Sequence, residues 1–144
     1  MLKGIDPLLN PDLLHILASM GHGDNLLIVD ANFPADSMAQ RLTRLPGIDT
    51  TTALKAILTV FPLDQYVQQP VAVMSVVNEP DAIPETEQEY QAVLNESEGE
   101  VVAIERLERF DFYARAREAY AIVATGEQRL YGNIFLSKGV IKPE

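Results

Sequence analysis

The chain has 144 residues, of which 47% are hydrophobic and 22% charged, with no cysteine and a formal net charge of −10 at pH 7. This length and composition are typical of a globular domain, so we expect residues 1–144 to form a single domain. The absence of cysteine excludes a disulfide framework, a thiolate nucleophile and cysteine-ligated zinc. The 21 acidic residues against 11 basic ones argue against a nucleic-acid partner, because such binding depends on Lys and Arg at the phosphates.

The hydrophobic residues are distributed without a long apolar run. No stretch of about 18 consecutive apolar residues occurs, which argues against a membrane-spanning helix. Residues 1–10 lack the basic flank and apolar core of a signal peptide. We therefore expect a cytoplasmic protein with no membrane partner.

Amphipathic helices and short apolar strands alternate along the chain. Asn10 as N-cap and Pro11 at the first helical position open the first helix, which Gly21 is expected to stop. The sequence further predicts strands at 26–29, 71–77, 101–104, 120–124 and 134–136, a short helix or turn at 37–42, and helices near 54–61, after Pro84 and at 110–117. This order predicts a three-layer α/β/α fold with a mixed, mainly parallel central sheet.

The segment from Glu79 to Glu100 is strongly acidic. It contains eight acidic residues and no basic one. Charge runs of this kind usually form a solvated surface, so we expect these side chains to face water.

The chain has two histidines, and they differ in context. His15 lies within the first helix, where packing or a surface hydrogen bond is the expected role. His22 is flanked by Gly21 and Gly23 just after a helix end, which leaves an imidazole open to a small ligand. The alternative is structural, because a cation is also stabilised at a helix C-terminus.

Asp30 and two arginines occupy the ends of predicted strands. Asp30 closes the strand at 26–29, and ligands of α/β sheets lie beyond the carboxyl ends of strands. It could equally cap the following turn. Arg106 and Arg109 lie at a strand-to-helix passage, where they could contact a ligand or pair with surface glutamates.

The sequence Tyr131-Gly132-Asn133 before the last strand suits recognition of a polyol. The Asn133 amide offers two donors and an acceptor to vicinal hydroxyls, and Gly132 leaves the backbone open to close approach. A tight turn with Tyr131 at the edge of the core is the structural alternative.

Common cofactor motifs are missing. There is no complete dinucleotide fingerprint, no phosphate-binding lysine loop, no paired-histidine zinc motif and no Gly-x-Ser-x-Gly turn. His22, Asp24 and Asp30 are too dispersed to make a convincing cation site. We expect no metal and no cofactor.

Several ordered motifs together resemble the L-fucose mutarotase family, which is related to the D-ribose pyranases. The resemblance extends from Leu2 to about Val140, and residues 121–127 are especially similar to the fucose branch. The matching motifs are Met20-Gly21-His22-Gly23-Asp24, Asp30-Ala31-Asn32-Phe33-Pro34, Arg109-Phe110-Asp111-Phe112-Tyr113, Thr125-Gly126-Glu127, Tyr131-Gly132-Asn133 and Lys138-Gly139-Val140.

The resemblance implies a sugar mutarotase: a cofactor-free isomerase that interconverts the α and β anomers of L-fucose or a close monosaccharide. It makes His22 the proton donor, and it assigns sugar binding to Asp30, Arg109, Tyr131, Gly132 and Asn133. It also implies a homo-oligomer, typically a decamer of two stacked pentamers. Some members have histidine in place of Asn32 and phenylalanine in place of Tyr120, which bears on the polarity of the pocket.

The reaction itself asks for one acid and one base. A proton leaves the anomeric hydroxyl, another reaches the ring oxygen, and the open aldehyde recloses on either face; histidine suits this near neutral pH. Tyr120 and Tyr131 are candidates for the second proton carrier. The alternatives are a ribose pyranase and a non-catalytic sugar-binding or transport-accessory protein.

The spacing of His22 and Asp30 has a geometric consequence. They flank one predicted strand, and eight extended residues span up to roughly 26 Å, too far for both to touch one monosaccharide. We therefore expect the pocket to be completed across a subunit interface, with His22 supplied by one chain and sugar-binding residues by its neighbour.

Overall fold

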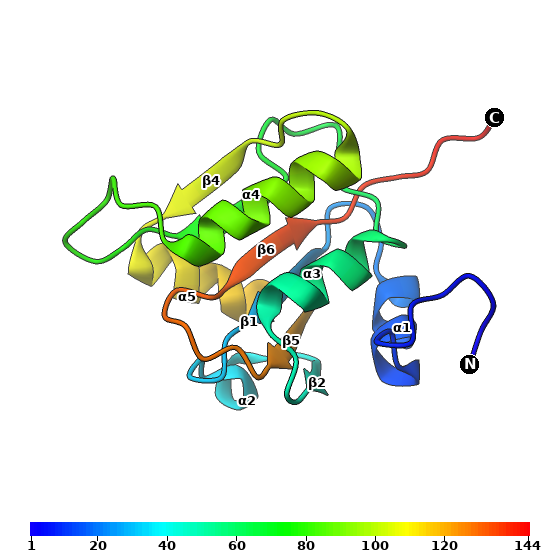
Figure 1. Cartoon of the computed structure of the whole chain (residues 1–144), viewed down its shortest axis with the longest axis horizontal. Coiled ribbons are helices and arrows are strands. Elements are labelled where there is room, and N and C mark those ends of the chain that lie inside the picture. The colour runs from blue at the N-terminus through cyan, green and yellow to red at the C-terminus, as the bar shows by residue number, and fades with distance from the viewer.

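A six-stranded sheet between two layers of helices forms the protein, as a computed structural model of residues 1–144 shows (Figure 1). None of the helices is both long and apolar enough to cross a membrane. The elements are α1 (Pro11–Ser19), β1 (Asn25–Val29), α2 (Ala35–Met38), β2 (Leu42–Leu45), α3 (Thr50–Leu58), β3 (Val71–Met74), α4 (Glu85–Glu98), β4 (Ile104–Leu107), α5 (Arg109–Glu118), β5 (Ala121–Thr125) and β6 (Ile134–Ser137).

The sheet is mixed and mainly parallel. Its strand order is β2-β5-β1-β6-β3-β4. β6 runs antiparallel to both of its neighbours, β1 and β3, whereas β1, β5 and β2 are parallel to one another, as are β3 and β4. All strands except β6 therefore end at the same edge, which we call the carboxyl edge; the opposite one is the amino edge.

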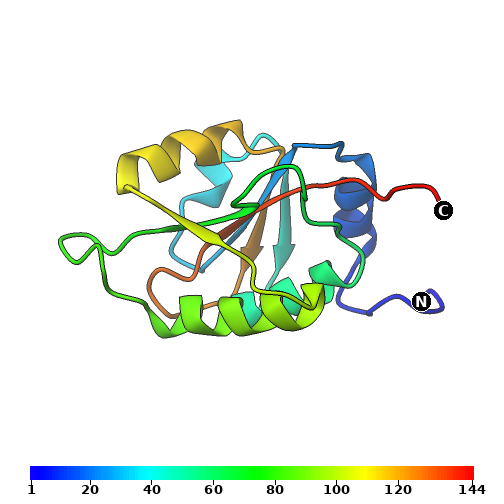
Figure 2. The ribbon, with the colours of Figure 1, turned by 90° about the horizontal axis from the view of Figure 1, so that it is seen from above.

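Each face of the sheet has its own apolar core, because side chains alternate along a strand. Leu26 and Ile28 of β1 belong to a cluster with α1, α3 and α4, whereas Leu27 and Val29 belong to a second cluster with α2 and α5. Figure 2 shows α3 and α4 on one side of the sheet and α2 and α5 on the other, with α1 beside one end of the sheet. The predicted three-layer α/β/α architecture is confirmed.

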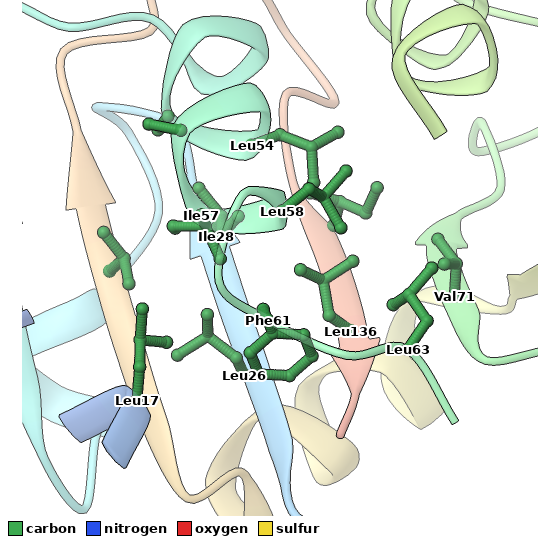
Figure 3. Close-up of a cluster of buried hydrophobic side chains, with 14 of the residues drawn as sticks. Leu17, Leu26, Ile28, Leu54, Ile57, Leu58, Phe61, Leu63, Val71 and Leu136 are labelled. Atoms are coloured by element: carbon green, nitrogen blue, oxygen red, sulfur yellow. The ribbon is translucent and has the colours of Figure 1, made fainter. Parts of the chain in front are cut away.

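Helix α3 illustrates how the first face is filled. Its apolar side chains, among them Leu54 and Ile57, lie over β1 and β6 (Figure 3). Both side chains are fully buried, and burying a leucine or isoleucine contributes about 1.5 to 3 kcal/mol. Asp49 fixes the start of α3, since its side chain accepts a hydrogen bond from Thr52 N.

The first helix begins where the sequence predicts but ends before Gly21. Asn10 Oδ1 accepts from Leu13 N at 2.9 Å, as expected of an N-cap. At the other end, Lys138 Nζ donates to the carbonyl of Leu17 at 2.8 Å and also to that of Met20. The last turn is thus closed by a lysine from the end of the chain, and glycine is not needed for that purpose.

Two predicted strands differ from those found. The strand predicted at 101–104 is wrong: Val102 N donates to Asn95 Oδ1, and Gln91 Nε2 donates to the Val102 carbonyl, so α4 side chains occupy this backbone and β4 begins at Ile104. The strand predicted at 71–77 stops at Met74, after which the Ser75 hydroxyl and N–H both donate to Leu107 O.

A further strand was not predicted at all. Residues 42–45 form the edge strand β2, and the preceding helix α2 ends at Met38, so the predicted short helix or turn at 37–42 is only partly correct. Four residues at a sheet edge, with Leu42 and Arg44 not buried, are too few for a clear alternating pattern.

Candidate functional site

Four of the predicted sugar-binding residues meet at the carboxyl edge. Asp30 follows β1, Arg109 follows β4, and Tyr131 and Asn133 precede β6. They line one open pocket of about 290 Å³, close to the roughly 300 Å³ lower end of small-molecule sites. The other residues of the pocket are Asn32, Phe33, Pro34, Met74, Val77, Tyr113 and Leu130.

Asp30 is the buried carboxyl group of this pocket. The residue is 6% exposed, its N–H donates to Asn133 Oδ1 at 2.8 Å, and its Oδ1 accepts from Asn32 N at 3.0 Å. Burial raises the pKa of Asp30 above its ordinary value, although N–H groups, including those of Asn32 and Gly132, hold it down in part. Asp30 both caps its turn and presents a carboxyl group suited to proton exchange with a sugar hydroxyl.

Tyr131 is held in an unusual backbone conformation. Its φ of 60° lies in the left-handed region, and its carbonyl accepts a hydrogen bond from Thr86 Oγ1 at 3.3 Å. The Tyr131 hydroxyl accepts from Val77 N at 3.1 Å. Because that bond uses an acceptor lone pair, the hydroxyl hydrogen is free to donate to a ligand oxygen.

Gly132 does not line the pocket but allows the loop to close tightly. A Cβ atom at this position would lie 2.7 Å from Glu127 Cγ and 3.3 Å from Asp30 Cβ. Any side chain here would push Asp30 and the loop apart. We predicted that Gly132 leaves the backbone open to a ligand. In the structure it instead allows close packing behind the pocket.

A group of charged residues that we did not predict holds the loop between β5 and β6. Arg129 Nη2 donates to Glu127 Oε1 at 2.8 Å and to Glu89 Oε1 at 3.1 Å. Thr50 Oγ1 donates to Glu127 Oε1 at 3.1 Å from the start of α3. We call Glu127, Arg129 and Glu89 the loop clamp, since they tie the loop carrying Tyr131 and Asn133 to α4.

The charged groups of the loop clamp shift one another's pKa values. The Glu127 side chain is 4% exposed, and the hydrogen bonds from Arg129 lower its pKa to about 2 despite its burial. The same guanidinium lowers the pKa of Glu89 and raises that of Arg129 itself. One sequence signal was available: Arg129 is the only basic residue between residues 121 and 137. In the structure it pairs with Glu85 and Glu89 of α4.

The two arginines near β4 have different environments. Arg106 donates to both carboxylate oxygens of Glu87, with Nε 2.9 Å from Oε1. Glu87 is 6% exposed, so the expectation that the acidic segment faces water throughout is wrong at this residue. Arg109 makes no ion pair within the chain; its guanidinium stacks 4.7 Å from the Phe110 ring centroid and borders the pocket. Arg109 is thus available to ligand oxygens.

His22 lies at the amino edge, away from the pocket. The strand between it and Asp30, β1, has five residues and spans roughly 13 Å at about 3.3 Å per residue. The loop from α1 into β1 and the loop from β5 to β6 are at opposite ends of the sheet (Figure 1). The His22 side chain is 45% exposed, and its Nε2 is 3.1 Å from Asp64 Oδ1.

Tyr120 also lies at the amino edge. Its N–H donates to Asn25 O at 2.9 Å at the start of β5, and the Arg41 guanidinium covers its ring at 3.9 Å. The structure therefore brings Tyr120 to the same edge as His22 and separates it from the pocket residues. Because His22 and Asp30 lie at opposite edges, they also cannot share one cation with Asp24 within the chain.

Many α/β proteins have a polar pocket at the carboxyl edge of their sheet. Comparison with known proteins shows to which family this chain belongs. The sequence profile of the RbsD / FucU transport protein family matches residues 3–141. The chain is 47% identical over 140 residues to the L-fucose mutarotase of Actinobacillus pleuropneumoniae serotype 5b (strain L20), covering 97% of each chain. This chain belongs to the RbsD / FucU transport protein family.

Two solved structures are similar over nearly the whole chain. The fucose mutarotase of Streptococcus pneumoniae, crystallised in complex with L-fucose, is 43% identical with a TM-score of 0.91, covering 98% of this chain and 100% of that one. RbsD of Bacillus subtilis, complexed with D-ribose, is 26% identical with a TM-score of 0.72, covering 99% and 100%.

Proposed function

We propose that this protein interconverts the α and β anomers of L-fucose. The observation that carries the proposal is the convergence of Asp30, Arg109, Tyr131 and Asn133 on one pocket of monosaccharide size. The full-length similarity to L-fucose mutarotases supports the sugar, since both identity and TM-score are higher for the fucose mutarotase than for the ribose-bound RbsD. Residues 1–144 act as one mutarotase domain.

Some pocket residues bind the sugar, and others transfer the protons that open its ring. Arg109 and the Asn133 amide bind hydroxyl oxygens, and the Tyr131 hydroxyl donates a further hydrogen bond. Asp30 accepts the proton of the anomeric hydroxyl as the bond between C1 and the ring oxygen breaks. The electron pair of that bond stays on the ring oxygen, which takes a proton from His22, and reclosure on either face of the aldehyde reverses both transfers.

The acid comes from a neighbouring copy of the chain. His22 and the pocket lie at opposite edges of the sheet, so one sugar reaches both only where the amino edge of one protomer meets the carboxyl edge of another. Tyr120, at the same edge as His22, is a second proton carrier to be tested there. The assembly is a homo-oligomer, a decamer of about 159 kDa for ten chains of 15.9 kDa, which mass photometry measures directly.

Magnetisation-transfer NMR on equilibrated L-fucose tests the activity. We expect the protein to accelerate exchange between the two anomer signals, and His22→Ala to lose that acceleration while still binding L-fucose. Unchanged exchange with retained binding would instead support a non-catalytic sugar-binding role. Faster pyranose–furanose exchange of D-ribose than anomer exchange of L-fucose would identify a ribose pyranase.

Mixed oligomers test the shared pocket. Neither His22→Ala nor Asp30→Asn is expected to accelerate exchange alone, but copies unfolded together and reassembled would contain interfaces with one intact acid and one intact pocket. We expect such mixtures to regain part of the activity. If the pocket were completed within one chain, mixing would recover nothing.

A further inference from the structure

A hydrogen bond joins the loop between β3 and α4, residues 75–84, to a hydroxyl group of the pocket. The N–H of Val77 donates to the Tyr131 hydroxyl oxygen at 3.1 Å. The loop 75–84 projects from the body of the molecule (Figure 2), whereas Tyr131 lies between β5 and β6. Two loops whose contacting residues are 54 positions apart in the chain therefore meet at a side chain of the pocket.

A tight turn exposes the Val77 N–H to this contact. Val76 and Glu79 form an isolated antiparallel bridge, and Glu79 N donates to the Val76 carbonyl at 3.1 Å. Between them, Asn78 has a φ of 64°, whereas the φ of Val77 is not positive. This combination defines a type II turn with Val77 at its second position and Asn78 at its third. The turn's own hydrogen bond does not use the N–H of the second residue, so that of Val77 is left for Tyr131.

The chain's two non-glycine residues with positive φ both lie at this contact. One is Asn78, next to Val77, and the other is Tyr131 itself, with a φ of 60°. Residues with a side chain adopt this conformation at a cost, and such strained residues cluster at functional sites. Thr86 Oγ1 also donates to the Tyr131 carbonyl at 3.3 Å, so Tyr131 is held at both its backbone and its hydroxyl group.

The bond from Val77 limits how the Tyr131 hydroxyl can act. A phenolic hydroxyl carries one hydrogen to donate and accepts through its oxygen. Since the Val77 N–H already donates to that oxygen, the hydroxyl hydrogen must point elsewhere, and no acceptor of the chain pairs with it. Val77 and Tyr131 both line the pocket, so the hydrogen is available to a ligand oxygen there.

We propose that Val77 is a positioning residue for Tyr131: its main-chain N–H holds the phenolic oxygen so that the hydroxyl donates to an oxygen of the sugar. This inference rests on the proposed function, which assigns the pocket to a monosaccharide. Without the bond, the hydroxyl is free to rotate and to accept from a sugar hydroxyl instead. The loop 75–84 thus contributes to sugar binding through its backbone.

The first test removes the N–H and keeps the turn. Proline is common at the second position of a type II turn and has no N–H, so Val77→Pro should keep the loop folded. We expect it to weaken L-fucose binding in calorimetry by about 3- to 10-fold relative to Val77→Ala, as for the loss of one hydrogen bond. Val77→Ala is the matched control, because it shortens the side chain but retains the N–H. Equal affinities of the two variants would overturn the proposal.

A double-mutant cycle tests whether Val77 acts through Tyr131. Tyr131→Phe removes the hydroxyl group, so in that background Val77→Pro should bind L-fucose as tightly as Val77→Ala does. In the parent background, the effect of Val77→Pro should lie mainly in the half-saturating sugar concentration and less in the anomer exchange rate at saturation. A loss of affinity by the same factor in both backgrounds would show a general disturbance of the loop and contradict the assigned role.

Hydrogen exchange tests the bond itself without any sugar. Val77 is 41% exposed, so its N–H would exchange rapidly with water if it had no partner. We expect Tyr131→Phe to accelerate exchange of one amide within residues 75–84, measured by mass spectrometry. Unchanged exchange would overturn the proposal even if Val77→Pro failed to fold. If the parent neither binds L-fucose nor accelerates its anomer exchange, the mutarotase proposal fails instead, and the exchange data still decide whether Val77 holds the Tyr131 hydroxyl.

Discussion

Removing Arg129 should destabilise the protein in a pH-dependent manner. The fall of the Glu127 pKa from its ordinary 4.5 to about 2 corresponds, at about 1.36 kcal/mol per unit, to roughly 3 kcal/mol. The Arg129 side chain is 33% exposed, so water screens part of that interaction. We expect Arg129→Met to lose about 2 kcal/mol of unfolding free energy at pH 7, because Glu127 remains buried without its partner.

The sign of the pH dependence follows from the direction of the shift. A carboxyl group whose pKa is lower in the folded chain stabilises the fold above its unfolded pKa, here about 4.5. This contribution decreases as the pH falls from 4.5 toward 2, where the group becomes protonated in the folded chain as well. The difference between parent and Arg129→Met should therefore be full at pH 7 and smaller at pH 3.

Urea unfolding at one fixed protein concentration measures this difference, and fixing the concentration matters because assembly also contributes to stability. Arg44→Met is the control: Arg44 lies 3.8 Å from Asp36 in a pair whose side chains are 60% and 92% exposed, so its loss should cost less than about 0.5 kcal/mol. Two results would contradict this prediction. One is an equal loss of unfolding free energy in the two variants; the other is a difference between the parent and Arg129→Met that is the same at pH 7 and pH 3.

Two further substitutions test the pocket itself. Gly132→Ala places a Cβ 2.7 Å from Glu127 Cγ, so we expect about 1 to 3 kcal/mol of destabilisation in urea and weaker L-fucose binding by calorimetry; an unchanged protein would mean that the loop adapts freely. Asp30→Asn keeps an acceptor for Asn32 N but removes the base, so anomer exchange should slow by at least about 100-fold in magnetisation-transfer NMR, with the fold intact by circular dichroism. Exchange at the parent rate would exclude Asp30 as the base.

Local signals in the sequence predicted most of the fold. The predicted cap Asn10 acts within three residues of its partner, and the buried run of β1 is readable from its own side chains. The edge strands β2 and β4 were harder to predict from the sequence, because a strand that is only partly buried lacks a continuous apolar run. The prediction placed β4 too early in the chain, at the apolar residues 101–104. Side chains of α4 hydrogen-bond to the backbone of Val102 there, so that this segment does not join the sheet.

The pocket residues could be anticipated for a similar reason. Asp30 and Arg109 each follow a parallel strand, and the carboxyl ends of such strands meet at one edge. Asn133 precedes β6 and joins them because β6 runs antiparallel to its neighbours. The interactions that support the site were not predictable in this way. Arg129 finds Glu89 across 40 residues and His22 finds Asp64 across 42, and no periodicity links partners so far apart in the chain.

The separation of His22 from the pocket also constrains the assembly. Both edges carry exposed apolar side chains. Tyr66 lies next to His22 at the amino edge, and Phe110 and Leu130 lie near the pocket at the carboxyl edge; each is more than 60% exposed in the isolated chain. A head-to-tail contact between unlike edges would cover both with one kind of interface and complete one pocket per contact. Repeated by rotation, such a contact closes into a ring in which every copy both gives and receives a histidine. Subunit assembly would then be a requirement of the proposed chemistry, because an isolated chain holds His22 and the pocket at opposite edges of its sheet.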